Sequence, residues 1–412
     1  MPKIQPFRAL TYTHDAGAWD TLCCPPYDIV SEQEQSVLES RNPYNAILLE
    51  RPLGEDPYKT AKERLDTWLD SGILHRDEQP AYYMIEMDFI VNEKNYILRG
   101  FTARLELSPF SEGKVLPHEE TLSKAKADRL ALMEATGCTF SAIYCLYNDD
   151  GAASEVMTTV SQLPPEIEFS MPDGITHRLW RITDAKLQEK LTVALENKQV
   201  FIADGHHRYE TALKYRELNG GDFIMATLVD MSDSGLVVLP THRLISGCAP
   251  DAPERLLTAM RDVCHVEEIS LHGGTGAEPP QCPPGHLASI LMYYNGKTYM
   301  FAFENIDVME KILPDKSDVY RGLDVAILHS LMLEPHFGID KNAMSAQKNL
   351  TYIRDMDEAV RMVDCGEGQC AFILAATKIS QIRDVSLAGE KMPQKSTYFY
   401  PKLITGLGFN EV

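Results

Sequence analysis

A run of polar and glycine residues, Asp204-Gly205-His206-His207-Arg208, stands between an apolar segment and a helical one. The start of a helix presents unpaired N–H groups and partial positive charge, which favour phosphate. Gly205 lets a ligand approach the backbone, Arg208 can form two hydrogen bonds with phosphate oxygens, and the two histidines add donors. Asp204 is suited to hold Mg²⁺ or to accept a proton. The alternative is a structural turn in which Asp204 caps the helix.

A second candidate segment, His118-Glu119-Glu120-Thr121, precedes a predicted helix. A carboxylate beside a histidine can act as a general base or as a metal ligand. The segment is not the motif of a zinc protease, because Leu122 stands where the second ligand histidine would be. The alternative is a capping loop followed by a solvated, charged helix face.

A third candidate lies near the C-terminus, where Lys391, Lys395, Ser396 and Thr397 could contact phosphate or carboxylate. The segment lacks the glycines of a P-loop. The three aromatic residues 398–400 follow it, and burying them is favourable, so we expect this tail to be docked. We predict that it lines the same cleft as the two segments above. The alternative is a structural strap whose lysines face solvent.

Composition excludes several classes of function. The 412 residues include 39 basic and 60 acidic ones, a net charge of −21, which disfavours binding to nucleic acid or to an anionic membrane. The nine cysteines contain no C-x-x-C pair, which indicates reduced thiols. No apolar run approaches the roughly 18 residues of a membrane span. We therefore expect a cytoplasmic protein with small-molecule partners, and homo-oligomerisation stays open.

Helical and strand patterns alternate along the chain, which predicts an α/β or mixed α+β fold. The pattern around the first candidate is helix from Asp184, strand over 200–203, polar turn, helix to Asn219 and buried strand over 223–229. Two hairpins are also predicted. The first is half-buried and covers 82–107, and the second turns at Asn295-Gly296, which suits a type I′ turn.

Gly/Pro-rich stretches near 247–253 and 272–285 indicate linkers. We therefore expect a main domain over 1–246 that holds both the H-E-E-T and A-D-G-H-H-R segments. A smaller α/β segment would cover 247–312. A C-terminal region over 313–412 would dock back on the active-site cleft.

Eight segments, in order from end to end, resemble a bacterial family known as domain of unknown function 1015. They are KIQPFRAL, PPYDIV, RNPYN, LPHEET, KADRLAL, IADGHHRYETAL, LPTHR and KMPQKSTYFYPKLITGL. The A-D-G-H-H-R-Y segment in turn resembles the superfamily of the ParB nucleotide-binding domain, sulfiredoxin and the free-serine kinases. That resemblance implies a ParB/sulfiredoxin-like nucleotide-binding core with N-terminal, inserted and C-terminal additions.

The free-serine kinases have a D-G-x-H-R-Y turn that cradles nucleotide phosphates. The residues here that match it are Asp204, Gly205, His207, Arg208 and Tyr209. They also have an upstream His-Glu pair followed by Thr, whose glutamate is the base. His118 and Glu119 are similar, although one extra glutamate separates this pair from the threonine.

The resulting hypothesis is Mg²⁺-dependent phosphoryl transfer from ATP or ADP to a small hydroxyl metabolite, such as free serine or another amino acid. Such transfer depends mostly on positioning and charge stabilisation. Glu119 would be the base, with His118 and Asp204 as the other catalytic residues and Asp204 as the metal ligand. The phosphate contacts would come from Gly205, His206, His207, Arg208, Lys395, Ser396 and Thr397.

Two alternatives stay open. One is a nucleotide-binding switch without metabolite chemistry, which would need no base at Glu119. The other is a metal-dependent hydrolase built on His206, His207 and Glu210.

Overall fold

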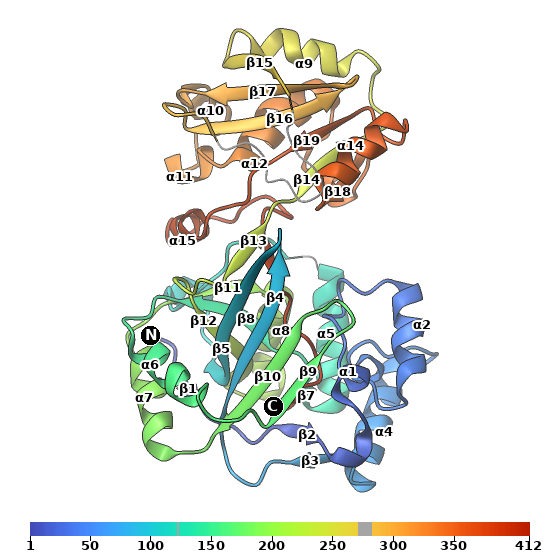
Figure 1. The fold of residues 1–412 in the computed structure, drawn as a ribbon, viewed down its shortest axis with the longest axis vertical. Helices are drawn as coiled ribbons and strands as arrows, with labels where there is room; N and C mark the ends of the chain where they lie inside the picture. Colours follow the sequence, from blue (N-terminus) through green and yellow to red (C-terminus); the bar gives the residue numbers. More distant parts are fainter. Residues whose placement is uncertain (122, 271–281) are drawn as a thin grey trace. The chain divides into compact units, whose positions relative to one another are not determined.

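The computed structural model describes residues 1–121, 123–270 and 282–412, and it confirms the mixed α/β class (Figure 1). The chain forms two compact units. The first unit contains 1–117, 121–237 and 401–412, and the second contains 118–120 and 238–400. The domain boundaries expected at 246 and 312 remain predictions, and residues 272–281 of the expected second linker lie outside the described residues.

A nine-stranded mixed sheet forms the centre of the first unit. Two pairs, β8 with β12 and β6 with β11, are parallel, and the other pairs are antiparallel. The strand order is β6 (Val115–Leu116), β11 (Val200–Asp204), β8 (Ile143–Tyr147), β12 (Phe223–Asp230), β5 (Lys94–Glu106), β4 (Tyr82–Val91), β10 (Thr176–Ile182) and β9 (Ile167–Ser170), and β1 (Ile4–Gln5) pairs with β5.

The hairpin predicted over 82–107 is confirmed as β4 and β5, but the expectation that it is half-buried is wrong. Residues 82–87 of β4 are buried on both faces. Met84 belongs to the apolar core on one face, while Tyr83 and Ile85 line a cavity on the other. The helix-packed core covers one face of this part of the strand, and the C-terminal segment covers the other. Towards the turn the strand does meet solvent, since Ile90 is 67% exposed.

Eight α-helices accompany this sheet in the described part of the first unit. Aspartates cap two of them: the Asp56 carboxylate accepts from the Lys59 N–H, and Asp184, where the sequence predicts a helix start, accepts from the Lys186 N–H. The helices are α1 (Trp19–Leu22), α2 (Glu32–Arg41), α3 (Ile47–Glu50), α4 (Pro57–Asp70), α5 (Ser123–Thr136), α6 (Ala152–Val160), α7 (Ala185–Leu195) and α8 (His206–Asn219).

Two apolar cores hold this unit together. One packs the sheet against α6, α7 and α8, and the other joins α1–α4 with β2 (Leu10–Tyr12) and β3 (Leu74–Arg76). Phe409 is fully buried in the second core, and β21 (Asn410–Glu411) pairs with β7 (Cys138–Thr139). The C-terminal segment is therefore an integral part of the first unit.

The second unit contains a six-stranded antiparallel sheet. Asn295 and Gly296 have φ values of +52° and +73°, as a type I′ turn requires, which confirms the second predicted hairpin. The strand order is β15 (His265–Ile269), β17 (Lys297–Phe303), β16 (Ala288–Tyr294), β19 (Cys370–Ile373), β14 (His242–Ile245) and β18 (Leu350–Ile353).

Helices and a short ribbon complete the second unit. The ribbon pairs β13 (Val237–Leu239) with β20 (Tyr398–Tyr400). The helices are α9 (Ala252–Met260), α10 (Asp307–Ile312), α11 (Asp318–Arg321), α12 (Asp324–Ile327), a π-helix (Leu328–Phe337), α13 (Lys341–Ser345), α14 (Met356–Asp364) and α15 (Ile379–Leu387). Across the described ranges of both units, no helix has the length and apolar character that crossing a membrane requires.

Candidate functional site

The turn between β11 and α8 is as tight as the sequence predicts. Gly205 joins the two elements with a φ of +93°. A Cβ at this position would lie 2.8 Å from Ile143 Cγ2 and 3.1 Å from Arg208 Cζ. The positive φ and the close approach of the Ile143 and Arg208 side chains therefore both require glycine at this position. The same closeness holds the Arg208 guanidinium, a permanent cation, at the start of α8.

Asp204 forms an ion pair that the sequence did not predict. Lys402 Nζ donates to Oδ2 at 2.9 Å, and the Gly205 N–H donates to Oδ1 at 2.8 Å. Burial alone would raise the pKa of Asp204, but the charges of Lys402 and Arg208 outweigh burial and hold that pKa well below its ordinary value. Asp204 is thus an ionised counter-ion and does not cap α8.

Two arginines from different elements lie near Tyr27. The Arg129 guanidinium, on α5, lies over the Tyr27 ring with Cζ 4.1 Å from the ring centroid. Arg208 donates to the Ala142 carbonyl at 2.6 Å. Burial raises the pKa of Tyr27 to about 12, although the charges of Arg208 and Arg129 oppose the shift. The P-P-Y-D, A-D-R-L and G-H-H-R segments therefore meet in the first unit.

A cleft of about 390 Å³ adjoins these arginines, and both line it. Arg129 is buried, and it donates to the Glu50 carbonyl at 2.7 Å and to Glu50 Oε1 at 3.3 Å. The Ser141 hydroxyl donates to the same Oε1 at 2.9 Å. The charge of Arg129 is thus compensated from within the fold, while Arg208 brings a second guanidinium to the cleft wall.

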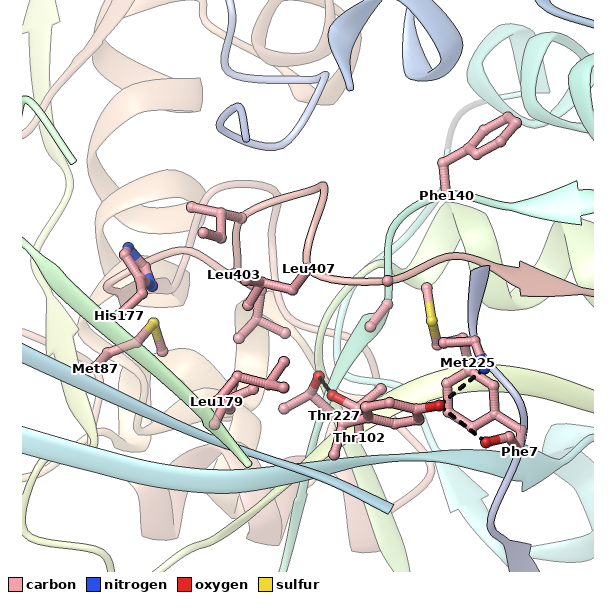
Figure 2. A pocket seen from close by; sticks show the side chains of 16 residues that line it. Phe7, Met87, Thr102, Phe140, His177, Leu179, Met225, Thr227, Leu403 and Leu407 are labelled. Atoms are coloured by element: carbon pink, nitrogen blue, oxygen red, sulfur yellow. Dashed lines mark hydrogen bonds between the residues drawn. The ribbon is translucent and has the colours of Figure 1, made fainter. Parts of the chain in front are cut away.

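An apolar cavity of about 540 Å³ lies next to the turn, and Figure 2 shows the side chains around it. Ala142, whose carbonyl accepts from Arg208, lines this cavity. Leu403, the neighbour of Lys402 in the chain, lines it as well. The other large apolar side chains of the wall are Phe7, Ile85, Met87, Phe140, Leu179, Met225, Ile404 and Leu407.

Polar side chains interrupt this apolar wall at a few points. The Thr102 and Thr227 hydroxyls lie 2.8 Å apart and share a hydrogen bond (Figure 2). His177 is only 2% exposed, and its Nε2 has no hydrogen-bond partner among the described residues. Burial lowers the pKa of His177 to about 4, so the imidazole is neutral at physiological pH. A buried polar atom of this kind is one that a bound molecule would satisfy.

Glu210, in the second helical turn of α8, is engaged by residues that follow the H-E-E segment. The Thr121 hydroxyl and Lys126 Nζ each donate to Glu210 Oε2 at 2.7 Å. Within the described residues, no three His, Cys, Asp or Glu side chains are grouped so as to hold a metal ion. Asp204 as a ligand of Mg²⁺ therefore remains a prediction, and so do His206, His207 and Glu210 as metal ligands.

Other predicted site residues lie together in the second unit. His118 Nε2 is 3.0 Å from Thr397 Oγ1. Glu119 forms an isolated bridge with Met392, and the Met392 N–H donates to the His118 carbonyl at 2.7 Å. The H-E-E segment and the lysine-bearing tail, which are remote in the sequence, are thus hydrogen-bonded neighbours.

The tail makes further contacts within the same unit. The Lys395 carbonyl accepts from Arg243 Nη2 at 3.1 Å, and the Ser396 carbonyl accepts from the Thr377 hydroxyl at 2.7 Å. Phe399 is 1% exposed. The roles predicted for Lys395, Ser396 and Thr397 at phosphate remain predictions.

Sequence reasoning missed several residues of the first unit's site. Lys402 stood in the quoted tail segment, but nothing in its neighbours distinguished it from Lys391 or Lys395. Glu50 and Ser141 lie in ordinary amphipathic surroundings, and no local pattern marks them.

Three solved structures are similar to the chain, with low identity. A conserved hypothetical protein from Pyrococcus furiosus is 15% identical, with 76% of this chain and 94% of that chain covered and a TM-score of 0.37. Free serine kinase in complex with AMP is 14% identical, with 76% and 91% covered and a TM-score of 0.39. SbnI with C-terminal truncation from Staphylococcus aureus is 12% identical, with 73% and 85% covered and a TM-score of 0.34. TM-scores this low do not establish a shared arrangement of elements.

No curated protein matches the chain. One family model does match, over residues 4–326, which is most of the sequence, and its description is Protein of unknown function (DUF1015). The segments that carried the expected resemblance up to LPTHR fall inside this range, and the tail segment follows it. The chain therefore belongs to the DUF1015 family of proteins of unknown function.

Proposed function

We propose that the first unit binds ATP or ADP, and that the protein transfers a phosphoryl group from the nucleotide to a small hydroxyl metabolite. The observation that carries the proposal is the glycine turn at Gly205, which begins α8 beside Arg208 and the Lys402–Asp204 pair. A helix start with two cations is suited to phosphate. Asp204 compensates Lys402, but no salt bridge of the described residues compensates Arg208, whose charge an anionic ligand would neutralise.

The phosphates would lie at the start of α8. The N–H groups of the first helical turn, including those of His206 and His207, would donate to phosphate oxygens. Arg208 would form two parallel hydrogen bonds, and Lys402 would exchange Asp204 for a phosphate oxygen. Asp204 would then be the residue to hold Mg²⁺, which in such sites is bound by one or two carboxylates together with phosphate oxygens.

The base would occupy the apolar cavity. Two residues connect this cavity to the proposed phosphate site. Ala142 lines the cavity and accepts a hydrogen bond from Arg208, and Leu403 lines it and follows Lys402 in the chain. A flat aromatic base suits a wall of Met, Leu and Phe side chains. Its edge would offer a hydrogen bond to the neutral His177 Nε2, which has no partner in the described structure.

Glu119 would take the proton of the acceptor hydroxyl as its oxygen attacks the terminal phosphorus. The bond between that phosphorus and the bridging oxygen then breaks, and ADP leaves from ATP, or AMP from ADP. His118 would assist Glu119. Lys395 would neutralise charge on the transferred group, and the Ser396 and Thr397 hydroxyls would donate hydrogen bonds to it. The D-G-x-H-R-Y resemblance makes free serine the first acceptor to assay.

Isothermal titration calorimetry with ATP and with ADP, in the presence of Mg²⁺, tests the binding step. We expect Arg208→Ala to weaken nucleotide binding at least tenfold because a charge-assisted contact is lost. Arg41→Ala, which removes an exposed arginine of α2, is the matched control and should bind as wild type does. If the wild-type protein binds neither nucleotide, the proposal fails.

A coupled assay for ADP or AMP release, with and without serine, tests the transfer step. Release that depends on the acceptor supports phosphoryl transfer. Binding without any release would instead favour the nucleotide-dependent switch.

A further inference from the structure

The second unit contains a buried cation without a compensating carboxylate. Arg243 on β14 is fully buried. Its Nη1 donates to the Thr241 carbonyl and its Nη2 to the Lys395 carbonyl, while Cζ lies 4.7 Å from the Tyr352 ring centroid. Nε has no hydrogen-bond partner, and no carboxylate of the described residues forms a salt bridge with this guanidinium. A buried charge is costly unless an anion is paired with it.

Arg243 faces a small polar cavity of about 360 Å³. Beside apolar residues such as Leu323 and Leu374, its wall contains hydroxyl and amide side chains. They are contributed by Thr241, Thr377, Gln381 and Ser396.

The same cavity contains a carboxylate. Asp324, at the first position of α12, lines it together with Arg243. Burial raises the pKa of Asp324 to about 7, even though the charge of Lys378 and a hydrogen bond from the Ser289 N–H favour the ionised form. Asp324 and Arg243 form no salt bridge with each other. A guanidinium and a carboxyl group thus line one cavity without pairing with each other. A cationic group of a ligand would hold this carboxyl in its ionised form.

We infer that this cavity binds a free α-amino acid, with the α-carboxylate on Arg243 and the α-ammonium group on Asp324. A simple anion would not pair with Asp324, and a simple cation would be repelled by Arg243. A small zwitterion satisfies both. The small volume selects a short side chain, and the three hydroxyl groups of the wall could bind a polar one. This site goes beyond the phosphate-binding turn proposed above, whose residues 204–208 and 402 belong to the first unit. It shares Ser396 with the residues proposed at the transferred group.

The inference can be tested on the full-length protein by calorimetry with the common L-α-amino acids. The amino acid that binds best is then compared with its amide, which lacks the carboxylate, and with its α-hydroxy acid, which lacks the ammonium group. We expect the amino acid to bind at least tenfold more tightly than either analogue. The inference is overturned if no amino acid binds at millimolar concentration, or if an analogue binds equally well.

Two conservative variants test which residue binds the carboxylate of the amino acid and which binds its ammonium group. Arg243→Lys should weaken binding of the amino acid by about 10- to 100-fold and leave binding of the amide almost unchanged, because the amide has no carboxylate to lose. Asp324→Asn should remove the preference for the amino acid over the α-hydroxy acid. Persistence of both preferences in both variants would contradict the assignment.

Matched controls are available in the same unit. Arg261→Lys and Asp315→Asn change exposed residues and should bind as wild type does. Nucleotide titration of each variant separates this inference from the proposed function, because the nucleotide residues are unaltered. If a cavity variant fails to fold, the comparison of analogues on the wild-type protein still decides.

Discussion

Lys402 Nζ lies 2.9 Å from Asp204 Oδ2, although 198 residues separate the two along the chain. Both side chains are largely buried, with 14% and 21% exposed. The pair therefore ties the returning C-terminal segment to the end of β11, beside the start of α8. It also places the Lys402 ammonium group where we propose that phosphate binds.

Replacing Lys402 tests this relationship. We expect Lys402→Met to lower the affinity for nucleotide about tenfold, because a phosphate contact is lost. The free energy of unfolding should fall by about 2 kcal/mol, because the Asp204 carboxylate loses its donor while partly buried. Calorimetry and urea denaturation measure the two effects.

The double variant Asp204→Asn/Lys402→Met separates the two roles of Lys402. It should recover part of the lost stability, since no uncompensated charge remains, but none of the lost affinity. Lys214→Met, on the exposed part of α8, is the control and should change neither quantity. Wild-type nucleotide affinity in Lys402→Met would exclude this lysine from the phosphate site.

Two glycines provide a matched test of the turn. Gly205 and Gly221 have φ values of +93° and +92°, but a Cβ would meet other atoms only at Gly205. Gly221→Ala should lower the free energy of unfolding by about 1 kcal/mol, because only the strained backbone conformation opposes the substitution. Gly205→Ala should lower the free energy of unfolding by roughly 3 kcal/mol, because the Ile143 and Arg208 side chains must also shift. If urea denaturation gives the same loss of unfolding free energy for both variants, the close approach of Ile143 and Arg208 to Gly205 does not affect stability.

His177 should make stability depend on pH. Its pKa in the folded protein is about 4, below the ordinary value of 6.5, so the folded state binds fewer protons than the unfolded state between these values. The contribution of His177 is therefore fully present above pH 6.5 and is lost as the pH falls towards 4, by about 3 kcal/mol in all.

His177→Gln should flatten this part of the stability profile, which urea denaturation at several pH values measures. His14→Gln, at an exposed histidine, should leave the profile as in the wild type. If His177→Gln keeps the wild-type slope between pH 4 and 6.5, another group carries it.

Glu119 and Glu120 are adjacent and test the proposed base. Glu119→Gln should reduce kcat by about 10²- to 10⁴-fold and leave nucleotide affinity unchanged, because a general base acts on the acceptor. Glu120→Gln, which removes an exposed partner of Lys341, should retain activity. Equal activity of the two variants would exclude Glu119 as the base.

Local patterns were sufficient to predict much of the fold. Capping by Asp56 and Asp184 and the Asn295-Gly296 turn depend on residues that lie within a few positions of one another, so the sequence displays them directly. The strand-turn-helix around Gly205 is predictable for the same reason.

Long-range features were not predictable in this way. The burial of both faces of β4 depends on helices and on the C-terminal segment that pack against the sheet from distant parts of the chain. The partner of Asp204 is equally remote, because any of the lysines in the tail could have reached it. The sequence shows that Arg129 is charged, but it does not show that Glu50 compensates this charge. That contact depends on the packing of α3 against the rest of the unit.

Residues 401–412 complete the first unit only after residues 238–400 have been made. The ribosome synthesises the chain from its N-terminus, so on a nascent chain Asp204 still lacks Lys402, β7 lacks β21, and the apolar cavity lacks Leu403 and Leu407. The first unit thus stays unfinished throughout translation of the second. A chain whose synthesis stops before residue 401 therefore leaves this apolar surface open, and exposed apolar surface is what chaperones and proteases bind.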